Sequence, residues 1–80
     1  MKRKLSEISL DIMNNWSNIS PYAKPYLNAM LQIESSEPNT NYFLESVKTI
    51  VAYFLSNAAS WRGEAARRIK KELRENYGIK

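Results

Sequence analysis

The segment SWRGEAARRIKKELRENYGIK, residues 60–80, decides the fold of this chain. Ser60 is a suitable N-cap for a helix, and Gly78 ends the helix because glycine adopts the left-handed conformation at little cost. Ile79 is then expected to fold back onto the final turn. At about 100° per residue, the apolar side chains between these signals form one stripe, which predicts an amphipathic helix. The stripe consists of Ala65, Ala66, Ile69, Leu73 and Tyr77.

The charged side chains of this predicted helix are distributed unevenly on the two sides of the stripe. On one side the charges largely cancel, and these residues are Glu64, Arg68, Glu72 and Glu75. The other side is basic and consists of Arg67, Lys70, Lys71 and Arg74. Three interpretations of the basic side stay open: a solvated face, a contact surface for an acidic protein, or a nucleic-acid surface. The solvated face would be supported by i,i+4 ion pairs: Glu64 with Arg68, Arg68 with Glu72, and Lys71 with Glu75.

Residues 43–58, just before this segment, have the widest apolar face in the chain. Their apolar side chains recur every three or four residues, which predicts a helix at the centre of the fold. The β-branched residues 49–51 favour a strand locally, but the helical period extends over about four turns and overrides them. Tyr53 lies off the apolar face and is expected to be partly buried. The face consists of Phe43, Leu44, Val47, Ile50, Val51, Phe54, Leu55 and Ala58.

A helix is also predicted from Leu5 to Trp16, where apolar residues again recur at helical spacing. Leu10 and Met13 lie off its main stripe, so we expect this helix to be apolar on two sides and wedged between neighbours.

A fourth helix, ending near Ile33, has two alternative starts. Ser20 and Pro21 are a capping residue and a first-turn proline, which favour a start at residue 21. Pro25 lacks the N–H that would bond back to residue 21, so a single turn followed by a helix from residue 25 agrees equally well with the sequence. Residues 34–41, ESSEPNTN, are predicted to form a polar loop.

These segments predict an all-α protein, a compact bundle of three to four helices in one domain covering residues 1–80. A chain this short buries only roughly 60% of its unfolded surface, so the core is thin and self-association to a homo-oligomer would stabilise it. With no cysteine and no histidine, neither disulfides nor a zinc site are expected to support the fold. The predicted core consists of Leu5, Ile8, Ile12, Trp16, Leu27, Met30, Val47, Ile50, Val51, Phe54, Ile69 and Leu73.

The composition favours binding over catalysis. General acid–base chemistry most often uses histidine, and covalent catalysis by cysteine is impossible here. Gly63 and Gly78 are the only glycines, so the chain has no glycine-rich phosphate loop. The glutamate pairs at 34 and 37 and at 72 and 75 are typical of solvated helices. We therefore predict no enzyme activity, no catalytic residue, no metal site and no cofactor.

The net charge of +4 is concentrated at the two ends of the chain, and the middle is mildly acidic. This segregation favours an anionic partner. A nucleic acid would use the basic side of the last helix together with Lys2, Arg3 and Lys4. The last two helices could imitate a helix-turn-helix, but Trp61 and Arg62 stand where a recognition helix usually offers polar side chains to base edges.

Trp61 and Arg62 bracket the turn before Gly63 and admit two interpretations. In one, Trp61 covers the core, and Gly63 is a point of close packing where a neighbouring helix needs room. In the other, Trp61 is an exposed anchor for a partner, since tryptophan and arginine are enriched at binding hot spots. The candidate binding residues are therefore Trp61, Arg62, Arg67, Lys70, Lys71 and Arg74.

No export signal or membrane span is expected. Glu7 and Asp11 interrupt the apolar segment that would have to follow the basic N-terminus of a signal peptide. The longest apolar run, residues 50–55, is far shorter than the roughly 20 residues of a membrane-spanning helix. The last helix is a weak membrane-surface candidate because its stripe contains two alanines and no phenylalanine.

Three strings, PYAKPYL at 21–27, YFLSNA at 53–58 and WRGEAARRIK at 61–70, resemble a class of small uncharacterised proteins encoded by phages and prophages of Gram-positive bacteria. The resemblance covers residues 8–74 and implies an accessory protein in the cytoplasm of a bacterial host cell. No functional residue is carried over from it. The leading hypothesis is binding to a host protein with an acidic surface, the second is nucleic-acid binding, and the third is a homo-oligomer that binds an anionic nucleotide.

Overall fold

The computed structural model describes residues 3–34, 41–42 and 45–79. Within them the predicted all-α fold is confirmed, because four helices contain most of the chain. The only strand structure in these ranges is one short antiparallel pair, with Asn41 opposite Ser46 and Tyr42 opposite Glu45. The elements in chain order are α1 (Leu5–Asn15), α2 (Lys24–Leu31), β1 (Asn41–Tyr42), β2 (Glu45–Ser46), α3 (Val47–Ser56) and α4 (Glu64–Tyr77).

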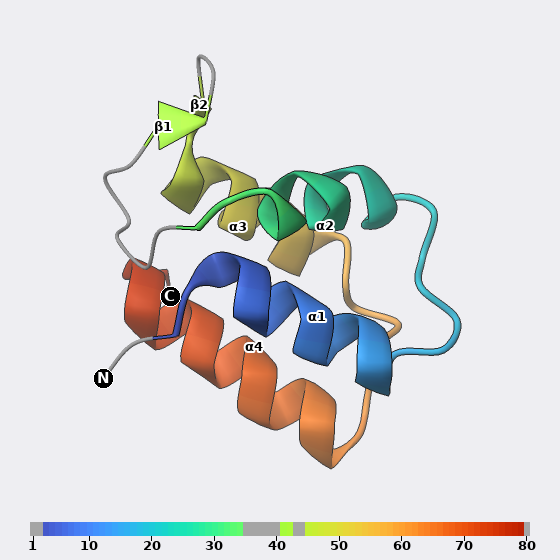
Figure 1. The fold of residues 1–80 in the computed structure, drawn as a ribbon. Coiled ribbons are helices and arrows are strands. Elements are labelled where there is room, and N and C mark those ends of the chain that lie inside the picture. Colours follow the sequence, from blue (N-terminus) through green and yellow to red (C-terminus); the bar gives the residue numbers. More distant parts are fainter. Residues whose placement is uncertain (1–2, 35–40, 43–44, 80) are drawn as a thin grey trace.

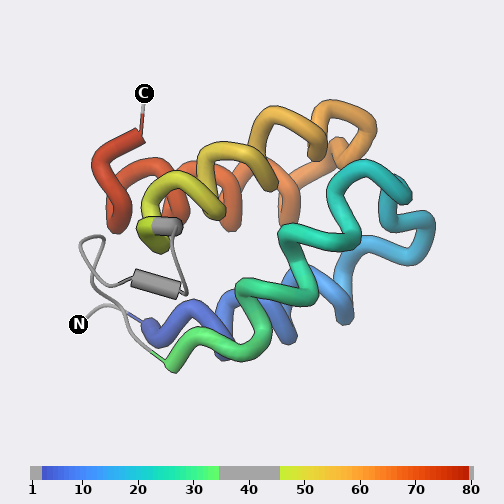
Figure 2. Tube along the Cα trace, turned by 90° about the horizontal axis from the view of Figure 1, so that it is seen from above, coloured from blue at the N-terminus to red at the C-terminus, as the bar shows by residue number. Residues whose placement is uncertain are grey.

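The helices form two layers, with α2 and α3 packed over α1 and α4 (Figure 1). The main helix contacts are those of α1 with α2 and α4, and of α3 with α2 and α4. Figure 2, seen from above, shows α2 over α1 and α3 over α4. In this arrangement α4 runs antiparallel to α1, and one side of α4 faces away from the rest of the bundle.

All twelve predicted core residues are buried. Trp16, at the end of α1, stacks on Trp61 in the turn before α4 at 5.3 Å and meets Phe54 of α3 edge-on at 6.2 Å. Helix α1 does lie against two neighbours, α2 and α4, but the expectation that Leu10 and Met13 form a second buried side is wrong, since they are 55% and 44% exposed. The core also contains Ala23, Ile33, Ala58, Trp61, Ala66 and Tyr77.

The start of α2 follows the second of the two alternatives for that helix. Residues 21–23 form a turn, and α2 begins at Lys24 with Pro25 in its first turn. The carbonyl of Ser20 accepts hydrogen bonds from the backbone N–H groups of Ala23 and Lys24 at 3.0 and 3.1 Å. Pro25 is therefore the second residue of α2, where a backbone N–H has no hydrogen-bond partner within the helix. The absence of an N–H in proline thus costs no helical hydrogen bond.

The helix predicted from residue 43 begins later, at Val47. Ser46 is its N-cap, and its hydroxyl oxygen accepts a hydrogen bond from the backbone N–H of Thr49 at 3.2 Å. This N-cap stabilises the start of α3 directly after β2. The predicted positions of Phe43 and Leu44 lie outside the described residues.

The predicted start of the last helix at Ser60 is also wrong. The helix begins at Glu64, and Gly63 is its N-cap with φ of 109° and ψ of −177°. The end of the helix is confirmed, because Gly78 is left-handed and the N–H of Ile79 donates to the carbonyl oxygen of Arg74 at 2.9 Å. The N-terminal turn therefore depends on a backbone conformation that essentially only glycine adopts.

Replacing Gly63 with alanine is expected to lower the free energy of unfolding by about 1–3 kcal/mol. The cost is conformational, because a Cβ at residue 63 would meet no atom within 4 Å. The expected role of Gly63 as a close-packing point is therefore wrong. Urea denaturation followed by circular dichroism measures the change, with Gly78→Asn as the control, since asparagine tolerates the left-handed region. Equal stability of Gly63→Ala and the native protein would contradict the argument.

Candidate functional site

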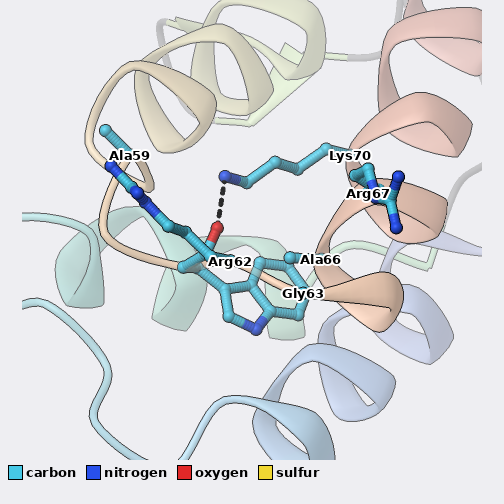
Figure 3. A pocket seen from close by; sticks show the side chains of 7 residues that line it. Ala59, Arg62, Gly63, Ala66, Arg67 and Lys70 are labelled. Atoms are coloured by element: carbon cyan, nitrogen blue, oxygen red, sulfur yellow. Dashed lines mark hydrogen bonds between the residues drawn. The ribbon is translucent and has the colours of Figure 1, made fainter.

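Lys70 was one of the candidate contact residues, but its side chain points into the fold. Its ammonium nitrogen Nζ donates hydrogen bonds to the backbone carbonyl oxygens of Ala58 and Trp61, both at 2.7 Å. Figure 3 shows Lys70 reaching from α4 toward the turn that precedes the helix. Burial lowers the pKa of Lys70, and the positive charges of Arg74 and Arg62 lower it further. Two of the three N–H donors of Lys70 thus support the turn, so its ammonium group is held in place and is less available to a partner than the sequence suggested.

Trp61 is not an exposed anchor, because its side chain is only 3% exposed. One face of its indole ring stacks on Trp16 at an interplanar angle of 10°. The ammonium group of Lys70 lies 5.9 Å from the ring centroid, which is a cation–π distance. The interpretation of Trp61 as a cover for the core is therefore confirmed.

A surface pocket of about 310 Å³ lies beside the turn between α3 and α4. It brings together three of the predicted site residues that have positive charges, Arg62, Arg67 and Lys70. Arg62 and Arg67 extend toward opposite sides of the pocket, with Lys70 between them (Figure 3). The lining contains no acidic side chain and is completed by Ala59, Trp61, Gly63 and Ala66.

Four predicted contact residues are exposed, and we call them the basic surface: Arg62, Arg67, Lys71 and Arg74. Residues 67, 71 and 74 share one face of α4 because they are four and seven positions apart. Within the part of the chain that the structure describes, none of the four side chains makes an ion pair. No carboxylate of the described residues is therefore paired with a cation of this surface.

The other side of α4 is neutralised, but by different pairs from those expected. Arg3 donates hydrogen bonds to Glu72 at 2.6 and 2.9 Å and to Asp11 at 3.1 Å. Arg68 lies 3.5 Å from the same carboxylate of Asp11. The hydrogen bonds with Glu72 raise the pKa of the Arg3 guanidinium. None of the expected i,i+4 pairs forms among the described residues, and Arg68 and Glu72 pair instead with Asp11 and Arg3.

These contacts weaken the larger nucleic-acid surface that the sequence suggested. Arg3 is engaged by two carboxylates and is no longer free to contact a phosphate. Lys2 lies outside the described residues, and Lys4 is exposed at the start of α1. Of the cations in the predicted nucleic-acid surface, mainly those of the basic surface are therefore available to an anionic partner.

The carboxylates offer no assembled catalytic site within the described ranges. Glu72 is paired with Arg3, while Glu34 accepts a hydrogen bond from Ser6 at 2.9 Å. No group of three or more potential metal ligands occurs in residues 3–34, 41–42 and 45–79.

Comparisons with protein-family models, curated proteins and solved structures gave no significant match. Across the ranges that the structure describes, none of the helices combines the length and the apolar composition needed to cross a membrane.

Proposed function

We propose that this protein acts by binding, and that its basic surface contacts an acidic surface of a host protein. The observation that carries the proposal is the group of exposed cations at positions 62, 67, 71 and 74, none of which makes an ion pair with the described residues. An uncompensated patch of one sign attracts a partner of the opposite sign and sets its orientation. In accord with the phage resemblance, the proposed place of action is the cytoplasm of a bacterial host cell.

The contacts of three other cations support this proposal. Arg3 and Arg68 are paired with carboxylates, and Lys70 is hydrogen-bonded to two carbonyl groups. A basic helix that was merely solvated would be expected to place its own glutamates beside its arginines and lysines. Here Glu72 pairs with Arg3 instead, and among the described residues no ion pair joins Glu64 or Glu75 to the basic surface.

Capture from nuclease-treated bacterial lysate tests the proposal by comparing the native protein with the Arg67→Glu, Lys71→Glu variant. We expect the variant to retain an acidic host protein about 30-fold less tightly, at ~1 kcal/mol for each reversed charge. The matched control is Lys24→Glu, Lys48→Glu, which changes the net charge equally at exposed positions of α2 and α3. Equal retention by the native protein and both variants would contradict the proposed surface.

Nucleic acid is the alternative partner for the same surface, and salt dependence distinguishes it. Four phosphate contacts would reduce the affinity for duplex DNA roughly 100-fold between 50 and 200 mM salt. If the captured material is nucleic acid with this dependence and no protein survives nuclease treatment, the host-protein proposal is wrong. A third alternative, a homo-oligomer that binds a nucleotide, requires a change of oligomeric state that sedimentation would detect.

A further inference from the structure

The pocket between the α3–α4 turn and α4 has the composition of a site for a small anion. Its volume of about 310 Å³ admits a group of a few heavy atoms with its water. Three of its seven lining residues have positive charges, and none is acidic. Arg74 lies one helical turn beyond Lys70 on α4, so a fourth positive charge is close to the pocket. So much uncompensated charge favours a dianion over a monoanion.

The donor groups differ in how firmly they are positioned. Two of the three N–H donors of Lys70 are occupied by the carbonyl groups of Ala58 and Trp61, which leaves one donor for a ligand. Arg62 and Arg67 are exposed and extend to opposite sides of the pocket (Figure 3). Exposed side chains change rotamer within nanoseconds. Their forked guanidinium groups can therefore turn toward an anion held at Lys70.

The aromatic side chain at the pocket indicates which part of a ligand is recognised. Trp61 is 3% exposed, with one ring face on Trp16 and Lys70 beside the ring. It therefore offers no free face on which a nucleobase could stack. Recognition must rest on the anionic group itself, for which arginine forks and a lysine ammonium are the usual protein partners.

We propose that this pocket binds the dianion of a phosphomonoester, with Lys70 as the fixed donor and Arg62 and Arg67 as the mobile ones. The proposal goes beyond the protein contact described above and does not depend on it. Phosphorylated side chains and nucleotides present the same group, so the test includes both.

Titration of the ¹⁵N-labelled full chain with inorganic phosphate at pH 7.5, at constant ionic strength, tests the proposal by NMR. We expect saturable shifts at the indole N–H of Trp61, at the backbone N–H groups of Gly63 and Ala66, and at the Lys70 ammonium. Between pH 5 and 7.5 the affinity for a phosphomonoester should rise about tenfold, since its second pKa is about 6. Sulfate, which is a dianion throughout this range, should show no such rise. Shifts that grow linearly and equally with chloride would overturn the proposal.

Two variants separate the pocket from general attraction to a basic helix. Arg67→Gln should lower the phosphate affinity about tenfold, since it removes a charge-assisted hydrogen bond. The matched control Lys71→Gln removes the same charge from α4 outside the pocket lining and should change the affinity less than about threefold. Ala59→Phe at the exposed edge keeps every cation but fills the pocket, and should reduce the affinity at least about tenfold. Equal effects of Arg67→Gln and Lys71→Gln, or full affinity in Ala59→Phe, would contradict the assignment.

Two further probes identify the source of the phosphate group. A nucleoside 5′-monophosphate and a phosphoserine peptide are titrated under the same conditions. Tighter binding of one of them than of inorganic phosphate identifies that class of ligand, while equal binding of all three shows that the phosphate group alone is recognised. Failure of all three would overturn the pocket assignment and leave the proposed host-protein contact intact, because that contact is tested by charge reversal and lysate capture.

Discussion

Replacing Trp61 with alanine is expected to lower the free energy of unfolding by about 3–5 kcal/mol. A chain of this length has a total stability of about 4–12 kcal/mol, so the loss is at least about a quarter of the total and would unfold much of the variant only if the native stability lies at the lower end of this range. The reason is that Trp61 is 3% exposed and stacks at 5.3 Å on Trp16, which itself contacts Phe54. Removing the indole ring therefore leaves a cavity beside α1, α3 and the turn before α4.

Urea denaturation followed by circular dichroism and tryptophan fluorescence measures this loss. Tyr22→Ala is the control, because Tyr22 is 75% exposed and its removal should change the stability by less than about 0.5 kcal/mol. Trp61→Phe should recover part of the stability by keeping an aromatic ring on Trp16. A Trp61→Ala protein as stable as the native one would mean that Trp61 is not part of the core.

Replacing Lys70 with methionine is expected to lower the free energy of unfolding by about 2–3 kcal/mol. Methionine keeps most of the aliphatic part of the side chain but cannot donate hydrogen bonds to the carbonyl groups of Ala58 and Trp61. The lowered pKa of Lys70 reflects the cost of burying its ammonium group. Because methionine does not have this cost, the expected loss of stability is limited to a modest value. Calorimetric or urea unfolding gives the value.

Lys71→Met is the matched control for this substitution. Lys71 is the next residue of α4, is exposed and makes no ion pair among the described residues, so its replacement should change the stability by less than about 0.5 kcal/mol. If both variants lose the same stability, Lys70 acts only through the general charge of α4 and the two hydrogen bonds contribute little.

Helical periodicity was sufficient to predict the fold class and the core, because apolar spacing is a local property of the chain. All twelve predicted core residues are buried, and residues 49–51 are helical in spite of their β-branched side chains. The helix ends were predicted less well. Ser60 is a good capping residue, yet α4 begins at Glu64, since Trp61 is drawn into the core and Gly63 makes the sharp turn.

The candidate site was predicted only in part. The sequence suggested a basic side of α4, and the structure shows that Arg62, Arg67, Lys71 and Arg74 are exposed. It also brings Arg62, Arg67 and Lys70 to one pocket, which spacing along the helix could not show because the turn before α4 provides part of the wall. The glycine between Trp61 and the helix was the one local signal of a sharp turn at that place.

The sequence by itself determined that this chain forms helices, which side chains are apolar enough to be buried, and that one side of the last helix is basic. Only the tertiary structure decided which charged side chains are held by ion pairs or hydrogen bonds. Asp11 and Glu72 are far apart in sequence, but the antiparallel packing of α1 on α4 brings both to Arg3. The ammonium group of Lys70 is likewise held by carbonyl groups of a neighbouring turn. Helix formation depends on residues three and four apart, whereas charge pairing depends on which elements pack together.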